Sequence, residues 1–139
     1  MTDTWAATCR LVVARAGNRC EYCRMHQSLQ GATFHIEHVV PQSAGGTDTP
    51  DNLALACPAC NLAKSNRTTA TDPATSQPVP LFHPRSHRWA EHFAWDGAVV
   101  VGLTPTGRAT VEAFGLNSPR RQLIRAAEGG FGLFPPETG

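Results

Sequence analysis

Residues 20–23 read Cys-Glu-Tyr-Cys, and residues 57–60 read Cys-Pro-Ala-Cys. Two residues between paired cysteines let one turn present both thiolates to one ion, and two such turns complete a tetrahedral site. The sequence therefore predicts a structural zinc ion held by Cys20, Cys23, Cys57 and Cys60, with four unligated buried cysteines as the alternative. A site closed by four cysteines leaves no open position on the ion, so this zinc is expected to stabilise the fold and not to perform chemistry.

The segment around the cysteine pairs is poor in large apolar residues. Few of them lie between Gly17 and Thr71, and 33 residues separate the two pairs, so a metal is the expected substitute for a larger core. The fifth cysteine, Cys9, lies in an apolar run and is predicted to be a small buried residue.

Local signals predict short elements before and after the cysteines. Apolar spacing and Gly17-Asn18 predict a helix over 4–16, and β-forming residues before Pro41 predict a strand over 32–40. Further along, the sequence predicts a loop over 43–52, a strand over 53–56, a helix from Pro58 to about Ser65, a connector over 68–80, aromatic packing over 88–95, a strand over 98–103, and helices over 106–114 and from Ser118-Pro119 to about Glu128.

The insert between the cysteine pairs carries polar residues in a distinctive order. It reads Phe34-His35-Ile36-Glu37-His38-Val39-Val40-Pro41, then Gly45-Gly46, then Asp51-Asn52-Leu53, and the second pair is followed by Asn61-Leu62-Ala63-Lys64. This order resembles the HNH endonuclease family, whose pattern is an acid-His pair, a Pro, a Gly-Gly loop, an Asn-Leu and a terminal His or Asn, often between two CxxC pairs. The resemblance covers roughly Cys20 to Arg67, about a third of the chain. The segment after Arg85 also resembles the C-terminal part of small bacterial HNH proteins.

The resemblance implies an α+β fold. Its core would be a ββα-metal, treble-clef-like unit with the four-cysteine zinc site, followed by a C-terminal α/β extension. The expected division is an N-terminal helix over 1–19, an HNH nuclease core over 20–70, an extension packing on that core over 71–128, and a flexible tail over 129–139.

The resemblance also implies a role for each polar residue of the insert. His38 corresponds to the general base, and imidazole can take a proton from water at neutral pH. Glu37 and Asn61 correspond to the ligands of the catalytic metal, and Asn52 to the residue that fixes the loop and helps to orient the base. Glu37 stands where Asp is frequent and Asn61 where His is frequent, and oxygen ligands of this kind favour Mg²⁺ or Mn²⁺.

Several further residues have two interpretations. His35 lies two residues before Glu37, on the same face of a strand, and is either a third metal ligand or phosphate contact or an ordinary strand histidine. Lys64 and Arg67 are candidates for binding the nucleic-acid phosphates, with a solvated helix end as the alternative. Arg120, Arg121 and Arg125 could follow a duplex backbone or form an exposed cationic face.

The leading hypothesis is an endonuclease that hydrolyses phosphodiester bonds in duplex DNA with Mg²⁺ or Mn²⁺. The alternatives are a non-catalytic zinc module that binds nucleic acid or protein, and a structural zinc domain that tethers a protein partner. No leader-like or membrane-spanning stretch is visible, so a cytoplasmic protein that does not contact a membrane is expected. The net charge of +1 identifies no partner, and the target sequence, the oligomeric state and the pathway are not encoded in any recognisable motif.

Overall fold

The computed structural model describes residues 4–29 and 31–136. Helix α1 (Thr4–Ala16) has the bounds predicted from the sequence and ends at Gly17, whose φ of 63° lies in the left-handed region. Near its C-terminus Arg15 donates to the carbonyl oxygens of Pro50 (2.7 Å) and Leu53, and these contacts fasten α1 to the segment that leads into the first hairpin.

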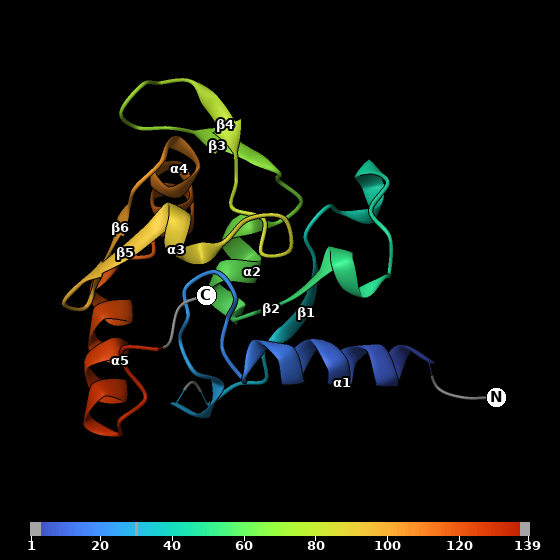
Figure 1. Cartoon of the computed structure of the whole chain (residues 1–139), viewed down its shortest axis with the longest axis horizontal. Coiled ribbons are helices and arrows are strands. Elements are labelled where there is room, and N and C mark those ends of the chain that lie inside the picture. Colours follow the sequence, from blue (N-terminus) through green and yellow to red (C-terminus); the bar gives the residue numbers. More distant parts are fainter. Residues whose placement is uncertain (1–3, 30, 137–139) are drawn as a thin grey trace.

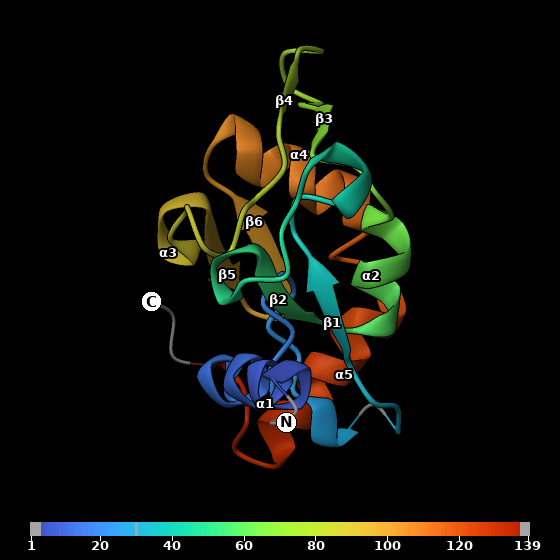
Figure 2. The same cartoon turned by 90° about the vertical axis from the view of Figure 1, so that its right-hand side faces the viewer.

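Two strands and a helix lie at the centre of the predicted HNH segment. Strand β1 (His35–His38) pairs antiparallel with β2 (Leu53–Ala56), with Glu37 opposite Ala54, and α2 (Pro58–Lys64) follows directly (Figure 2). The predicted strand over 32–40 was too long. Strand β2 has only four residues, because the 3₁₀ turn Pro50–Asn52 precedes it and Pro58 follows it closely. Since each strand residue needs a partner on the other strand, β1 is limited to four residues as well.

The second half of the chain is also mixed α and β. Figure 1 shows its hairpins and helices around α2. The structure contains strands β3 (Thr69–Thr71), β4 (Pro78–Pro80), β5 (Phe93–Asp96) and β6 (Val99–Gly102), helices α3 (Trp89–His92), α4 (Pro105–Phe114) and α5 (Pro119–Gly130), and short 3₁₀ turns at Gln27–Leu29 and Gln42–Ala44. The strands pair as three antiparallel two-stranded sheets: β1–β2, β3–β4 and β5–β6.

The prediction of a connector over 68–80 was wrong, because this segment folds into the β3–β4 hairpin. Asp72 fixes its turn by accepting hydrogen bonds from Ala74 N (3.0 Å) and Thr75 Oγ1 (3.1 Å). The same carboxylate accepts two hydrogen bonds from Arg108 of α4, at 3.0 and 2.9 Å. The hairpin therefore depends on a partner 36 residues away, which no local signal could indicate.

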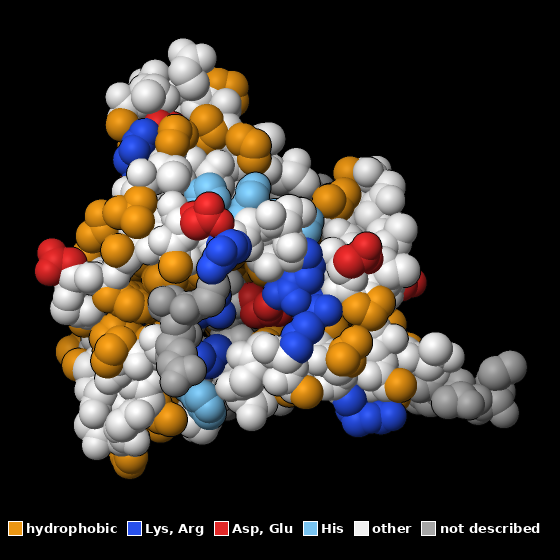
Figure 3. Space-filling view, in the orientation of Figure 1, with side chains coloured by type: hydrophobic (Ala, Val, Ile, Leu, Met, Phe, Trp, Pro, Cys, Tyr) orange, Lys and Arg blue, Asp and Glu red, His pale blue; other side chains and the backbone are white. Residues whose placement is uncertain are grey.

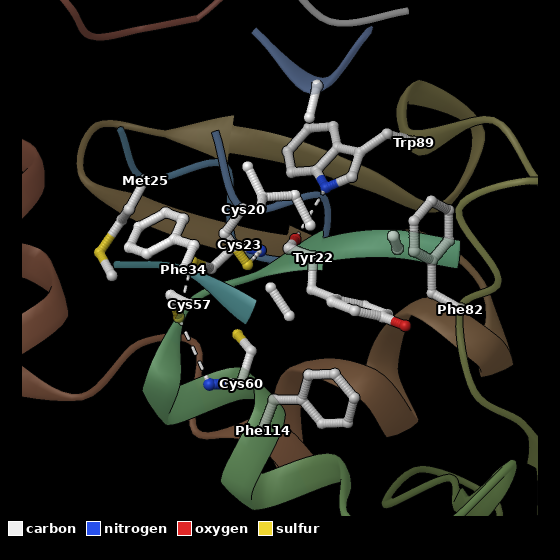
Figure 4. Packing of buried hydrophobic residues seen from close by; sticks show 14 of the residues in the cluster. Cys20, Tyr22, Cys23, Met25, Phe34, Cys57, Cys60, Phe82, Trp89 and Phe114 are labelled. Atoms are coloured by element: carbon white, nitrogen blue, oxygen red, sulfur yellow. Dashed lines mark hydrogen bonds between the residues drawn. The ribbon is translucent and has the colours of Figure 1, made fainter. Parts of the chain in front are cut away.

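One continuous core joins the predicted nuclease segment to the predicted extension. Tyr22, between the first two cysteines, packs edge-on against Phe82 and Phe114, and its carbonyl oxygen accepts a hydrogen bond from Trp89 Nε1 at 3.1 Å (Figure 4). Trp89 and Phe93 are buried, as expected for core aromatics. Cys9 was predicted to be buried but is half-buried beside a cavity between α1 and β1.

The chain after α5 returns to the body of the protein. Leu133 accepts a hydrogen bond from Arg19, and the ring of Phe134 lies 4.8 Å from that of Trp95. Residues 137–139 of the predicted flexible tail lie outside the described residues. Within 4–29 and 31–136, no helix is long and apolar enough to cross a membrane.

Candidate functional site

The four predicted metal-binding cysteines come together. Their sulfur atoms all lie within 4.8 Å of one another, and all four residues are buried (Figure 4). In each pair a backbone N–H points at the preceding thiol, from Cys23 to Cys20 Sγ at 3.5 Å and from Cys60 to Cys57 Sγ at 3.4 Å. The cluster is arranged to bind a metal, and no other group of three or more Cys, His, Asp or Glu side chains in the described part of the chain is.

The second cysteine pair lies where α2 begins. Cys57 is the N-cap residue and Pro58 follows it in the first turn, where its missing N–H is not needed. The side-chain hydrogen bonds of the neighbouring Cys20, Cys23 and Cys60 lower the pKa of the Cys57 thiol. Thiolate, the form that ligates metals, is thus favoured at Cys57, whereas burial raises the pKa of the Cys23 and Cys60 thiols.

The predictions for Arg121 and Arg125 were wrong, because both arginines are buried and neither forms an exposed cationic face. Arg121 Nη1 lies 3.1 Å from Cys60 Sγ, in contact with the four-cysteine cluster. Burial alone would lower the pKa of Arg121, but the nearby Cys60, Cys23 and Cys57 raise it. Arg120, the neighbouring cation, is exposed.

Glu37, the predicted metal ligand, is buried on β1 and faces α2. Its Oε1 accepts a hydrogen bond from Tyr22 OH at 2.5 Å, and its Oε2 lies 2.7 Å from Lys64 Nζ. Burial raises the pKa of Glu37, and the contacts with Lys64 and Tyr22 oppose that rise. Lys64 also donates to the carbonyl oxygen of His38 at 3.3 Å, so this lysine ties α2 to β1.

His38, the predicted base, lies next to Glu37 but is partly exposed. Its Nε2 is 2.7 Å from Asp48 Oδ1, and Gln42 Nε2 donates to the same oxygen at 3.0 Å. The ring of Trp5, from α1, lies nearly parallel to the imidazole, with 6.4 Å between centroids and 9° between planes. The hydrogen bonds from His38 and Gln42 lower the pKa of Asp48. Asp48 thus holds the imidazole at Nε2, and the ring of Trp5 lies over one face of it.

Asn52 closes the loop between the two strands. Its Oδ1 accepts from Val40 N, and its Nδ2 donates to the carbonyl oxygens of Val40 and Thr47, all at 2.9 Å. Gly46 packs so closely that a Cβ there would lie 1.7 Å from Val40 O. The Gly-Gly loop therefore requires glycine at this position, and its shape holds Asp48 within reach of His38.

Of the remaining predicted residues, His35 and Arg67 lie apart from this arrangement and Lys64 belongs to it. His35 is exposed at the start of β1, and Arg67 is exposed and donates to Ala63 O at 2.6 Å, within its own helix region. Asn61 is half-buried on α2, three residues before Lys64. Lys64 itself is fully buried against Glu37, so it is not presented to solvent like Arg67.

The contacts of Glu37 with Tyr22 and Lys64, and those of His38 with Asp48 and Trp5, were not predicted. Asp48 follows the Gly-Gly pair by two residues, which is the one sequence signal that could have marked it. Trp5 lies 33 residues before His38 and carried no signal for this role.

A cavity of about 390 Å³ lies beside the site, between the segment after β1 and the extension. Its walls include Val39, Val40 and Lys64 on one side and Phe82, His83 and His87 on the other. The ring of His87 packs on those of His83 and Phe82. On the face seen in Figure 3, Lys and Arg side chains gather near the middle, close to an acidic patch.

The comparisons with known proteins bear on the segment that contains this site. No curated protein and no solved structure matches the chain. A family model described as HNH endonuclease matches residues 20–67. The matched segment carries the four cysteines, β1, β2 and α2, and the match confirms the resemblance to HNH endonucleases predicted for this segment of the chain.

Proposed function

We propose that the protein is a metal-dependent endonuclease that hydrolyses phosphodiester bonds in DNA. The observation that carries the proposal is the pair Glu37–His38, in which a buried carboxylate and a partly exposed imidazole are adjacent on β1. The family match over 20–67 supports a nuclease-type domain with metal binding. In this proposal β1, β2 and α2 form the ββα-metal unit of a core over 20–70, and the helix over 1–19 and the extension over 71–128 pack on it.

His38 acts as the general base. Because its Nε2 is 2.7 Å from Asp48 Oδ1, the proton of the neutral ring belongs on Nε2, where it is donated to the carboxylate. Nδ1 is then the nitrogen that takes the proton from the attacking water. Asp48 and Trp5 are positioning residues, since one fixes the tautomer and the other the plane of the ring.

Glu37 and Asn61 would hold a catalytic Mg²⁺ or Mn²⁺. The donor set fits, because both side chains offer oxygen atoms, and a carboxylate oxygen that accepts one hydrogen bond retains a second lone pair. When bound, the ion polarises the phosphate and stabilises charge at the leaving oxygen. Asn52 keeps the loop, and with it Asp48, in place. A zinc ion at the four cysteines stabilises the fold.

The test is cleavage of supercoiled plasmid by the purified, zinc-loaded protein with Mg²⁺ or Mn²⁺, with EDTA as the metal-free control. His38→Ala is expected to lose about 10²–10⁴-fold in rate, the usual contribution of a general base. His35→Ala is the matched control, since it removes an exposed histidine from the same strand. Equal cleavage by wild type and His38→Ala would refute the assignment of the base.

The second candidate is a non-catalytic zinc-stabilised module that binds nucleic acid or protein. The observation in its favour is that Glu37 already contacts Lys64 and Tyr22 through both oxygens, as a purely structural carboxylate would. Binding of duplex DNA without cleavage at any Mg²⁺ or Mn²⁺ concentration would favour this candidate over the nuclease.

A further inference from the structure

Helix α5 turns a charged face toward the interior of the protein. Arg121, Arg125 and Glu128 are spaced by four and three residues, which places them on one side of the helix. Arg121 is 5% exposed, and Arg125 and Glu128 are 0% exposed. Charged side chains are almost never fully buried unless they are paired, so each needs a partner of opposite charge or a set of hydrogen bonds.

The first of these residues contacts the four-cysteine cluster, and the last contacts residues that flank its first cysteine pair. Arg121 donates to Cys60 Sγ at 3.1 Å, beside the second cysteine pair. Glu128 accepts a hydrogen bond from His26 N at 2.9 Å and lies 3.4 Å from Arg19 Nη1. These contacts fasten α5 to the loop that carries Cys20 and Cys23. Helix α5 therefore holds the two cysteine pairs together from outside.

Hydrogen bonds alone do not account for the buried arginines. Arg125 donates to the carbonyl oxygens of Ala98 (2.8 Å) and Leu116 (2.6 Å), yet its Nε is buried with no hydrogen-bond partner, and the same holds for Arg24 Nε. The guanidinium group of Arg125 lies 5.2 Å from the ring centroid of Trp95, and that of Arg24 lies 5.4 Å from that of Trp89. Burial lowers the pKa of both arginines, and the nearby cysteines, Cys23 and Cys60 for Arg125 and Cys20 and Cys23 for Arg24, oppose that change.

The spacing of the sulfur atoms indicates which kind of ion the cysteines bind, and this ion sets the net charge near the arginines. Zinc–sulfur bonds of about 2.3 Å in a tetrahedron separate the sulfurs by about 3.8 Å, and Cys23 Sγ lies 3.8 Å from Cys57 Sγ. All four sulfur atoms lie within 4.8 Å of one another, close to the spacing that a tetrahedral dication requires. Four thiolates and one dication carry a net charge of −2, which is costly to bury without cations.

We propose that α5 supplies the counter-charge of the four-cysteine centre, with Arg121 donating to the Cys60 thiolate and Arg125 and Arg24 completing a cationic shell around a doubly negative metal tetrathiolate. The predicted C-terminal extension is then part of the metal site. This inference is independent of the proposed nuclease activity, because it concerns only metal retention.

The experiment measures zinc affinity of the full chain by competition with a chromogenic chelator. Arg121→Met, which keeps the bulk and removes the charge, is expected to lose about 10–100-fold in affinity, as is usual when a group supporting a metal ligand is removed. Arg121→Lys, which keeps the charge, retains most of the affinity. Arg120→Met, an exposed neighbour on the same helix, is the matched control and binds zinc like wild type.

Two outcomes overturn the proposal. One is wild-type affinity in Arg121→Met, and the other is an equal loss in Arg121→Met and Arg121→Lys, which would reveal a packing role. Circular dichroism of the zinc-loaded variants checks that they are folded. If Arg121→Met does not fold, Arg24→Gln, on a half-buried loop position, takes its place and is expected to lose zinc affinity, and unchanged affinity there also refutes the cationic shell.

Discussion

Replacing Lys64 with Met is expected to destabilise the protein by about 3–5 kcal/mol, the usual cost of removing one partner of a buried ion pair. The side chains of Lys64 and Glu37 are 1% and 5% exposed, and 2.7 Å separates Nζ from Oε2, so water neither screens the pair nor replaces the lost partner. Tyr22 OH would remain the single hydrogen-bond donor to a buried carboxylate. The hydrogen bond from Lys64 to His38 O is lost as well.

The assay is urea unfolding of the zinc-saturated protein in a double-mutant cycle of Lys64→Met and Glu37→Gln. Because the double variant buries no unpaired charge, it is expected to be more stable than the sum of the single effects predicts, by about 0.5–3 kcal/mol. Arg67→Met is the control, since Arg67 is exposed on the same helix end and its loss is expected to have little effect. Additive single effects would refute the argument that the two charges depend on each other.

Three further perturbations have defined outcomes. Asn52→Ala removes three part-buried hydrogen bonds at 2.9 Å from the backbone of Val40 and Thr47, so unfolding by urea is expected to show a loss of about 2–4 kcal/mol. A loss below about 1 kcal/mol contradicts this. Arg108 lowers the pKa of Asp72 to about 2, below its value of about 3.9 in the unfolded chain. The stabilisation of the folded protein by the Asp72–Arg108 pair is therefore present above about pH 4 and is lost as the pH falls through about 2. The stability difference between wild type and Asp72→Asn should shrink over that range, and a constant difference would exclude this linkage. Removal of the cysteine-bound metal by a strong chelator is expected to unfold the segment 20–67, as followed by near-ultraviolet circular dichroism; an unchanged spectrum would show that the metal does not stabilise the fold.

The local elements were largely predictable because their signals are local. A proline after Cys57 begins α2, a serine before Pro119 begins α5, and glycine ends α1, and each signal lies within a few residues of the boundary that it sets. The β3–β4 hairpin was missed because its turn is fastened by Arg108 of a distant helix. The extent of β1 was overestimated because the length of a strand is set by its partner, here the four residues of β2.

The positively charged residues show most clearly what could not be predicted from the sequence. Lys64, Arg67, Arg121 and Arg125 all lie on or next to helices, and their sequence context predicted solvent or phosphate contacts for each. Only Arg67 is exposed, whereas the other three are buried against Glu37, Cys60 and backbone carbonyl oxygens. A cation can be buried only where an opposite charge or a set of acceptors meets it, and those groups come from elsewhere in the chain.

The sequence by itself determined the chemistry that is available. Paired cysteines, an acid–histidine pair and a glycine-rich loop are combinations of residue type and spacing, and these are readable in one dimension. The tertiary structure decided what each group contacts: Trp5 and Asp48 on His38, Lys64 and Tyr22 on Glu37, and Arg121 on Cys60. Burial and electrostatic partnership depend on distances between segments far apart in the chain, and only the packed fold sets those distances.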